Sequence, residues 1–192
     1  MRKKQTSYFT LKDVKPKNNL DNQKVHIGID PGKNGGIFIH YSEFNDYLFL
    51  QIPLIGKEFD IKALSDIFAN CENWNCFAVI EDVHSIFGAS AGATFDFGFG
   101  CGLLEGILVS HGIPYTKVQP KKWQAEMFEG IPLQQKPSST GKTIQKDTKR
   151  MAEMAAKRLF PSIDLRMTDK CKKSHDGKVD ALLICDYCKR NF

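Results

Sequence analysis

The sequence predicts an α/β protein in which helices flank a five-stranded mixed sheet. Short β-branched apolar runs recur along the chain, and helical patterns separate the later runs from one another. The first three runs are joined only by turns, so they should pair antiparallel. A strand that follows a helix most simply lies parallel to its predecessor, through a right-handed crossover. The sheet is therefore expected to be antiparallel on one side and parallel on the other.

Three strands form the expected antiparallel part. Val25 to Asp30 is apolar and β-rich, which is typical of a buried central strand. The turn Pro31-Gly-Lys-Asn-Gly-Gly36 leads into a second strand at Ile37 to Tyr41, and Tyr47 to Ile52 supplies the third.

The rest of the chain is expected to alternate helices with strands. The predicted helices are Asp60 to Cys71, Thr94 to His111, Asp147 to Phe160 and Asp176 to Lys189, and the predicted strands are Cys76 to Glu81 and Tyr115 to Gln119. Lys121 to Gln145 is predicted to be a mixed region with a flexible basic loop at Lys136 to Lys142.

Length and charge favour one basic domain with a tail. With 192 residues the chain has room for one medium-sized domain. We expect residues 1–23 to be a basic, disordered tail, because they are too polar to bury a core, and residues 24–192 to form the domain. The net charge of +5 permits a polyanionic partner without establishing one.

Two classes of protein are disfavoured. No apolar run reaches the roughly 18 residues that a membrane helix needs, so no membrane partner is expected. The six cysteines lack the spacing of a disulfide framework, and the pair Cys185 and Cys188 has no second pair beside it. Reduced thiols are therefore expected rather than zinc or redox chemistry, which indicates an intracellular, reducing compartment.

Acidic residues mark the ends of two predicted strands and one face of the last helix. Asp30 and Glu81 each close a buried run, and the two strands should lie parallel, so these carboxylates should meet. Asp176 and Asp180 are four residues apart, so on a helix they share a face. Carboxylates suit hard divalent cations, and two ions about 4 Å apart can clamp the attacking and leaving oxygens of a phosphodiester. The acids therefore predict a metal-dependent nuclease.

Five motifs between Val25 and Tyr187 carry a family resemblance. They are I-G-I-D-P-G-x-x-G-G, I-E-D-V-H-S-I-F-G, V-Q-P-K-K-W, K-x-x-x-x-x-x-A-x-R-L-F-P and H-D-G-x-x-D-A-L-L-I. I-D-P-G alone would be weak, since an Asp before a turn is often a turn-former, but the ordered set is specific. Together with the order of elements, the set resembles the RuvC-type Holliday-junction resolvases of the ribonuclease H-like superfamily, especially the phage and organellar branch.

The resemblance implies a set of metal ligands. Asp30, Glu81 and Asp180 take the places of three of the family's acidic ligands, and Asp176 that of a fourth, one helical turn before the last. Some family members keep the fourth ligand at the position of Gly177, so Asp176 is the less secure match. Asp176 could instead cap the last helix, and His175 could supply the ligand or a general base.

The family resemblance also implies that certain residues contact the DNA or assist its cleavage. Lys149 matches a catalytic basic residue of the family, with Lys146 as the alternative. Phe87, in the His84 to Gly88 segment, fits an apolar wedge at the junction centre, or else it fills the core. Further phosphate contacts are expected from His84, Lys121, Lys122, Lys142 and Lys146.

The implied activity is that of a structure-selective endonuclease. A homodimer would resolve four-way DNA junctions by paired nicks, with two Mg²⁺ ions in each active site, Mn²⁺ able to substitute, and no small-molecule cofactor. A ribonuclease H acting on RNA–DNA hybrids, or a nuclease for other branched DNA, is the alternative. Sugar-kinase and actin-like ATPases also begin I-G-I-D-x-G, but they need a second duplicated domain for which this chain has no room. A non-catalytic DNA-binding module is disfavoured because every candidate ligand is present.

Overall fold

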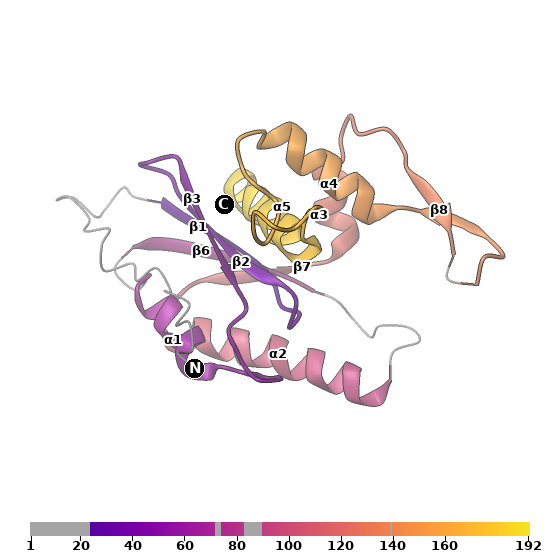
Figure 1. Ribbon diagram of the computed structural model, residues 1–192. Helices are drawn as coiled ribbons and strands as arrows, with labels where there is room; N and C mark the ends of the chain where they lie inside the picture. The colour runs from indigo at the N-terminus through magenta and orange to yellow at the C-terminus, as the bar shows by residue number, and fades with distance from the viewer. Residues whose placement is uncertain (1–23, 72–73, 83–89, 139) are drawn as a thin grey trace.

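A five-stranded sheet in the order β3-β2-β1-β6-β7 forms the centre of the molecule (Figure 1). The computed structural model describes residues 24–71, 74–82, 90–138 and 140–192. β1 to β3 form an antiparallel meander, and β6 and β7 continue the sheet in parallel. These strands are β1 (Lys24–Asp30), β2 (Gly36–Tyr41), β3 (Asp46–Gln51), β6 (Asn75–Glu81) and β7 (Tyr115–Val118). Strand order and directions are those of the ribonuclease H-like fold, so the predicted fold class is confirmed.

Helices cover both faces of the sheet (Figure 1). One face packs against α1 (Ile61–Ala69) and α2 (Ala91–Ser110), and the other against α3 (Pro120–Met127), α4 (Thr148–Leu159) and α5 (Asp176–Asn191). A separate hydrophobic core lies on each side, and β1 is buried between them along most of its length. Burial on both faces explains why its sequence is a continuous apolar run.

α5 lies unusually close to the central strand at Gly28. A Cβ atom placed on Gly28 would lie 2.1 Å from the backbone nitrogen of Cys185 and 2.5 Å from the carbonyl oxygen of Ala181. Only a residue without a side chain allows this approach, because the opposing atoms are helix backbone. The contact sets the position of α5 against β1, and with it the position of the acids that α5 carries.

The cysteines of the last helix belong to the core. Cys185 and Cys188 are buried free thiols. The Cys185 thiol donates to the carbonyl of His26 at 3.3 Å, and the Cys188 thiol donates to the carbonyl of Phe77 at 3.4 Å. Both thiols therefore tie α5 to the sheet as reduced side chains.

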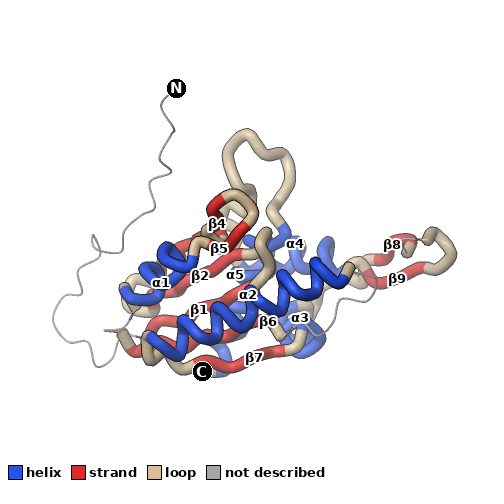
Figure 2. The backbone as a smooth tube through the Cα atoms, turned by 90° about the horizontal axis from the view of Figure 1, so that it is seen from below, coloured by secondary structure: helices blue, strands red, loops and turns tan. Residues whose placement is uncertain are grey.

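The region expected to be mixed is more ordered than predicted. Pro120 begins α3, and Trp123 and Met127 of that helix are buried in the core. The expected flexible basic loop is part of a hairpin of β8 (Gln135–Pro137) and β9 (Ile144–Lys146), which extends from the body of the protein (Figure 1, Figure 2). A second small hairpin, β4 (Leu54–Ile55) with β5 (Glu58–Phe59), was also not predicted.

α2 differs from the expectation about membrane helices. By length and composition alone, its 20 residues are apolar enough to cross a membrane, and only 22% of its most apolar stretch is buried in the protein. Four of its residues pack inward, namely Gly100, Leu104, Ile107 and Leu108. The statement that no apolar run is long enough was therefore wrong, and the absence of a membrane partner stays a prediction.

Candidate active site

The four predicted acidic ligands line one cavity of about 910 Å³. Asp30 is the last residue of β1 and Glu81 the last of β6, and these strands are neighbours in the sheet. Asp176 and Asp180 lie in the first turns of α5. The carboxyl ends of parallel strands meet at one edge of a sheet, and the start of α5 adds its acids there. We refer to this space as the acid cavity.

Asp30 is held in place by the turn that follows β1. The backbone N–H of Gly32 donates to its Oδ1 at 3.2 Å. Burial raises the pKa of Asp30 to about 6, the Gly32 hydrogen bond opposes that rise, and the charge of Asp176 adds to it. The side chain is therefore fixed at the cavity wall near a second carboxylate.

Glu81 is oriented by a tryptophan. The indole Nε1 of Trp123 donates to Glu81 Oε1 at 2.9 Å, and Trp123 is fully buried. Burial raises the pKa of Glu81 to about 7, while the Trp123 hydrogen bond lowers it and the charge of Asp30 raises it. The sequence did not indicate this contact, because no local pattern reveals a contact between residues 42 positions apart.

Asp180 shows that the carboxylates converge. Burial raises its pKa well above the ordinary value, and the charges of Asp30, Glu81 and Asp176 raise it further. Each of these groups is thus close enough to disfavour ionisation of Asp180. The acids that the sequence placed on three separate elements are neighbours in space.

The start of α5 shows which residue caps the helix and how much space there is at Gly177. His175, rather than Asp176, caps the helix, since its Nδ1 accepts the backbone N–H of Lys178 at 3.2 Å. A Cβ atom on Gly177 would lie 2.2 Å from the backbone oxygen of Asn34, so no side chain fits there. An acidic side chain at position 177 is therefore sterically excluded, and the neighbouring Asp176 is the residue that places a carboxylate in the acid cavity. His175 also lines the acid cavity.

Lys149, not Lys146, lies beside the acids. The Lys149 ammonium donates to Asp176 Oδ2, and Lys149 lines the acid cavity. This hydrogen bond raises the pKa of Lys149, and the charges of Asp176 and Asp180 raise it further. Lys146 lies at the end of β9, with its ammonium 5.1 Å from the ring centre of Phe128.

The other predicted site residues lie outside the acid cavity or outside the described residues. Lys121 and Lys122 are exposed on α3, and Lys142 is exposed in the connection between β8 and β9. His84 and Phe87 lie outside the described residues.

The donor set of the acid cavity fits a hard divalent cation. Among the described residues, no three His, Cys, Asp or Glu side chains lie close enough together to form a ready-made metal site. Every predicted acidic ligand nevertheless lines the same cavity, and carboxylate oxygens are the ligands that Mg²⁺ prefers. Burial first, and then repulsion from the neighbouring carboxylates, raises the pKa of Asp180, and a bound cation offsets such repulsion.

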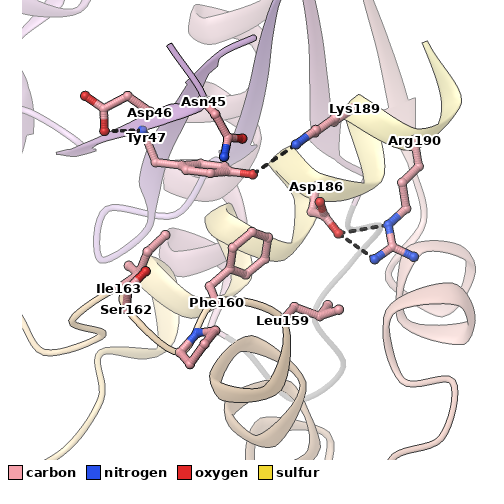
Figure 3. Close-up of a pocket in the computed structure, with 11 residues that line it drawn as sticks. Asn45, Asp46, Tyr47, Leu159, Phe160, Ser162, Ile163, Asp186, Lys189 and Arg190 are labelled. Carbon is pink, nitrogen blue, oxygen red and sulfur yellow. Dashed lines mark hydrogen bonds and ion pairs between the residues drawn. The ribbon is translucent and has the colours of Figure 1, made fainter. Parts of the chain in front are cut away.

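A second cavity, of about 600 Å³, lies near the other end of α5 (Figure 3). Arg190 donates through Nε to Asp186 at 2.8 Å, so these two charges compensate each other. Lys189 donates to the hydroxyl of Tyr47 at 3.5 Å. None of the four acids of the acid cavity lines this space. The acid cavity is therefore the candidate active site.

Comparison with known proteins gives structural but not sequence matches. No family model matches the sequence, and no curated protein matches it. The chain is similar to the structure of Thermus thermophilus RuvC, with a TM-score of 0.49 and 13% identity over 84% of this chain and 90% of that one. It is also similar to T. thermophilus RuvC in complex with a Holliday junction substrate, with a TM-score of 0.49 and 11% identity over the same shares.

Proposed function

We propose that this protein is a metal-dependent endonuclease that nicks DNA at four-way junctions. The observation that carries the proposal is the convergence of Asp30, Glu81, Asp176 and Asp180 on one cavity beside Lys149. Acids from the ends of two strands and the start of a helix form a site for cations, and phosphodiester hydrolysis is the chemistry that such cations assist. The junction as substrate follows from the motif resemblance.

The four carboxylates would hold Mg²⁺ or Mn²⁺. When bound, these ions would activate a water molecule and stabilise the leaving oxygen of the phosphodiester. The protein's contribution is to hold Asp30 through Gly32 and Glu81 through Trp123, so that oxygen ligands are presented at the cavity wall. The ion pair of Asp176 with Lys149 has both side chains more than half exposed, so it is weak, and Asp176 can exchange it for a cation.

One cleavage assay tests the proposal. Purified protein is incubated with a labelled four-way junction, linear duplex, flap and RNA–DNA hybrid, with Mg²⁺ and with chelator. We expect paired nicks in the junction that depend on Mg²⁺. Cleavage of the hybrid with the junction intact would assign the site to a ribonuclease H instead, and no cleavage of any substrate would overturn the proposal.

Lys149 is proposed to offset negative charge on the reacting phosphate. Its ammonium lies next to the acids and its pKa is raised by Asp176, so it stays protonated at neutral pH. A fixed cation at this place stabilises a transition state that carries more negative charge than the substrate.

Lys149→Ala should slow cleavage by about 10- to 100-fold with little change in junction affinity. The loss should fall on the chemical step, because the other cations that bind DNA remain. Single-turnover rates at saturating enzyme measure it. Lys146→Ala is the matched control, since Lys146 contacts Phe128 and not the acids. A larger rate loss in the control would exchange the two roles.

DNA binding is proposed to use the basic surface around the acid cavity. Lys142 and Lys146 lie on the β8–β9 hairpin and its connection, and Lys121 and Lys122 are exposed on α3. Phosphate contacts from such residues do not distinguish junctions from duplex. The segment from His84 to Gly88 begins three residues after Glu81 and remains the proposed reader of the junction centre, with Phe87 as its wedge.

α2 is proposed to pair two copies of the chain. Phe95 is 72% exposed, Phe99 48% and Val109 64%, so large apolar side chains of this helix lie on the surface. A four-way junction presents strands related by two-fold symmetry, and a two-fold dimer places one active site on each of them. Exposed apolar surface of this extent is typical of an interface.

Gly102→Leu should dissociate the dimer. A Cβ atom on Gly102 meets no atom within 4 Å in the single chain, so the leucine should leave the fold of the protomer intact. Light scattering should give about twice the chain mass for the native protein and the mass of one chain for the variant. A native protein that is monomeric and still makes paired nicks would contradict the prediction.

A further inference from the structure

A basic groove opens from the acid cavity. The groove has a volume of about 480 Å³ and lies between the start of α4 and the segment that precedes α5. Its lining shares five residues with the acid cavity, namely Lys149, Lys173, Ser174, Asp176 and Asp180. On its far side it reaches Lys136 of β8. The groove therefore leads from the candidate active site towards the base of the β8–β9 hairpin.

The carboxylates of the groove are largely engaged by neighbouring side chains. Lys136 donates to Asp147 at 3.0 Å, and this hydrogen bond holds the pKa of Asp147 below its usual range. Glu153 accepts from Lys157 at 2.6 Å and from Ser174 at 2.8 Å. These contacts tie the hairpin, α4 and the segment before α5 to one another, so the walls of the groove are connected.

Three cations of the groove have no such partner. Within the described part of the chain, the side chains of Arg150, Lys172 and Lys173 form no ion pair with any carboxylate. All three are exposed and line the same space, on opposite sides of the groove. Exposed cations that are not held in ion pairs, next to a cluster of carboxylates, suit a strand of phosphates, because the acids alone would repel it.

We propose that Arg150, Lys172 and Lys173 form a phosphate subsite for the strand that is cut. They would bind the one or two phosphodiesters adjacent to the scissile one, on the side of the strand that runs towards the β8–β9 hairpin. This inference rests on the proposed nuclease function and adds the path of the strand to it. No sequence pattern distinguishes these three residues from ordinary exposed lysines and arginines.

The test removes the three charges and counts the phosphate contacts that are lost. In the groove variant, Arg150, Lys172 and Lys173 are each replaced by Gln. In the matched control, Lys24, Lys57 and Lys62, which are exposed and do not line the groove, are replaced by Gln. Both variants lose the same net charge, so a difference between them reports the groove. Melting temperatures check that both remain folded.

Affinity for a labelled junction is measured in chelator over a range of salt concentrations. Each phosphate contact contributes roughly 0.9 to the slope of log affinity against log salt on duplex DNA. The groove variant should therefore lose about 1 to 2 from the slope, and the control variant much less. Equal slopes for the two variants would overturn the proposal.

Neutral methylphosphonates then locate the subsite. They replace single phosphates on either side of the position that the native protein nicks in Mg²⁺. The native protein should lose affinity for substitution on one side only, and the groove variant should show no further loss there, because the contact is already gone. Additive losses would overturn the proposal. If the native protein makes no nick, the proposed function fails, and the salt slopes still decide whether the groove binds phosphates.

Discussion

Asp30→Asn, Glu81→Gln and Asp180→Asn are each expected to reduce DNA cleavage by roughly 100- to 1000-fold or more, while junction binding survives. Each change removes a charged oxygen ligand from the acid cavity but leaves the cations of the basic groove and of the hairpin in place. Removing a carboxylate near phosphate also eases repulsion. Nicking in Mg²⁺ beside a gel shift in chelator measures both effects.

A stability measurement separates loss of a ligand from loss of the fold. Burial and three neighbouring charges raise the pKa of Asp180, so its ionised form costs stability at neutral pH. Asp180→Asn should therefore raise the melting temperature in chelator. Because the pKa of Asp180 is raised in the folded state, the penalty for its charge disappears as the pH falls and the carboxyl becomes protonated in the folded and then in the unfolded state. The difference in melting temperature between the two proteins should therefore narrow as the pH falls.

Asp66→Asn is the matched control for both measurements. Asp66 is paired with Lys62 on the exposed side of α1, away from the acid cavity. This variant should keep full activity and gain no stability. If Asp180→Asn keeps near-native nicking, Asp180 is not part of the active site. If it melts lower than the native protein in chelator, the repulsion inferred from its surroundings is wrong.

Gly28→Ala is expected to cost about 3 kcal/mol of folding stability. A Cβ atom there would meet the backbone of α5 at 2.1 to 2.6 Å, so the helix must move away from β1. Because α5 carries Asp176 and Asp180, the same shift should displace these acids from Asp30 and reduce cleavage. Urea unfolding measures the stability loss, and single-turnover nicking in Mg²⁺ measures the loss of activity.

Gly102→Ala should have the opposite effect on folding stability. No atom of the same chain lies within 4 Å of a Cβ atom at this helical position. Alanine should therefore stabilise the protomer, measured at a concentration where the protein is monomeric, by about 0.5 to 1 kcal/mol through its higher helix propensity. If Gly28→Ala loses less than about 1 kcal/mol, α5 can move without strain, and the close packing at Gly28 does not set its position.

Local patterns in the sequence were sufficient to predict the central sheet. Burial dictates the continuous apolar runs of β1, β2 and β6, because most residues of these strands are buried. An acidic residue at the last position of such a run lies at the end of its strand, where the strand leaves the core. For this reason the pattern of apolar runs is enough to place Asp30 and Glu81 together.

Contacts between distant segments decided the details of the site. The hydrogen bond from Trp123 to Glu81, the pairing of Lys149 rather than Lys146 with Asp176, and the exclusion of a side chain at Gly177 each join segments that are far apart in the sequence. Periodicity carries no information about such pairs, because it describes one element at a time. α3 was missed for a related reason: it is short, so the packing of Trp123 and Met127 rather than propensity stabilises it. The β8–β9 hairpin was missed because its strands have three residues each and are mostly exposed, so no apolar run marks them.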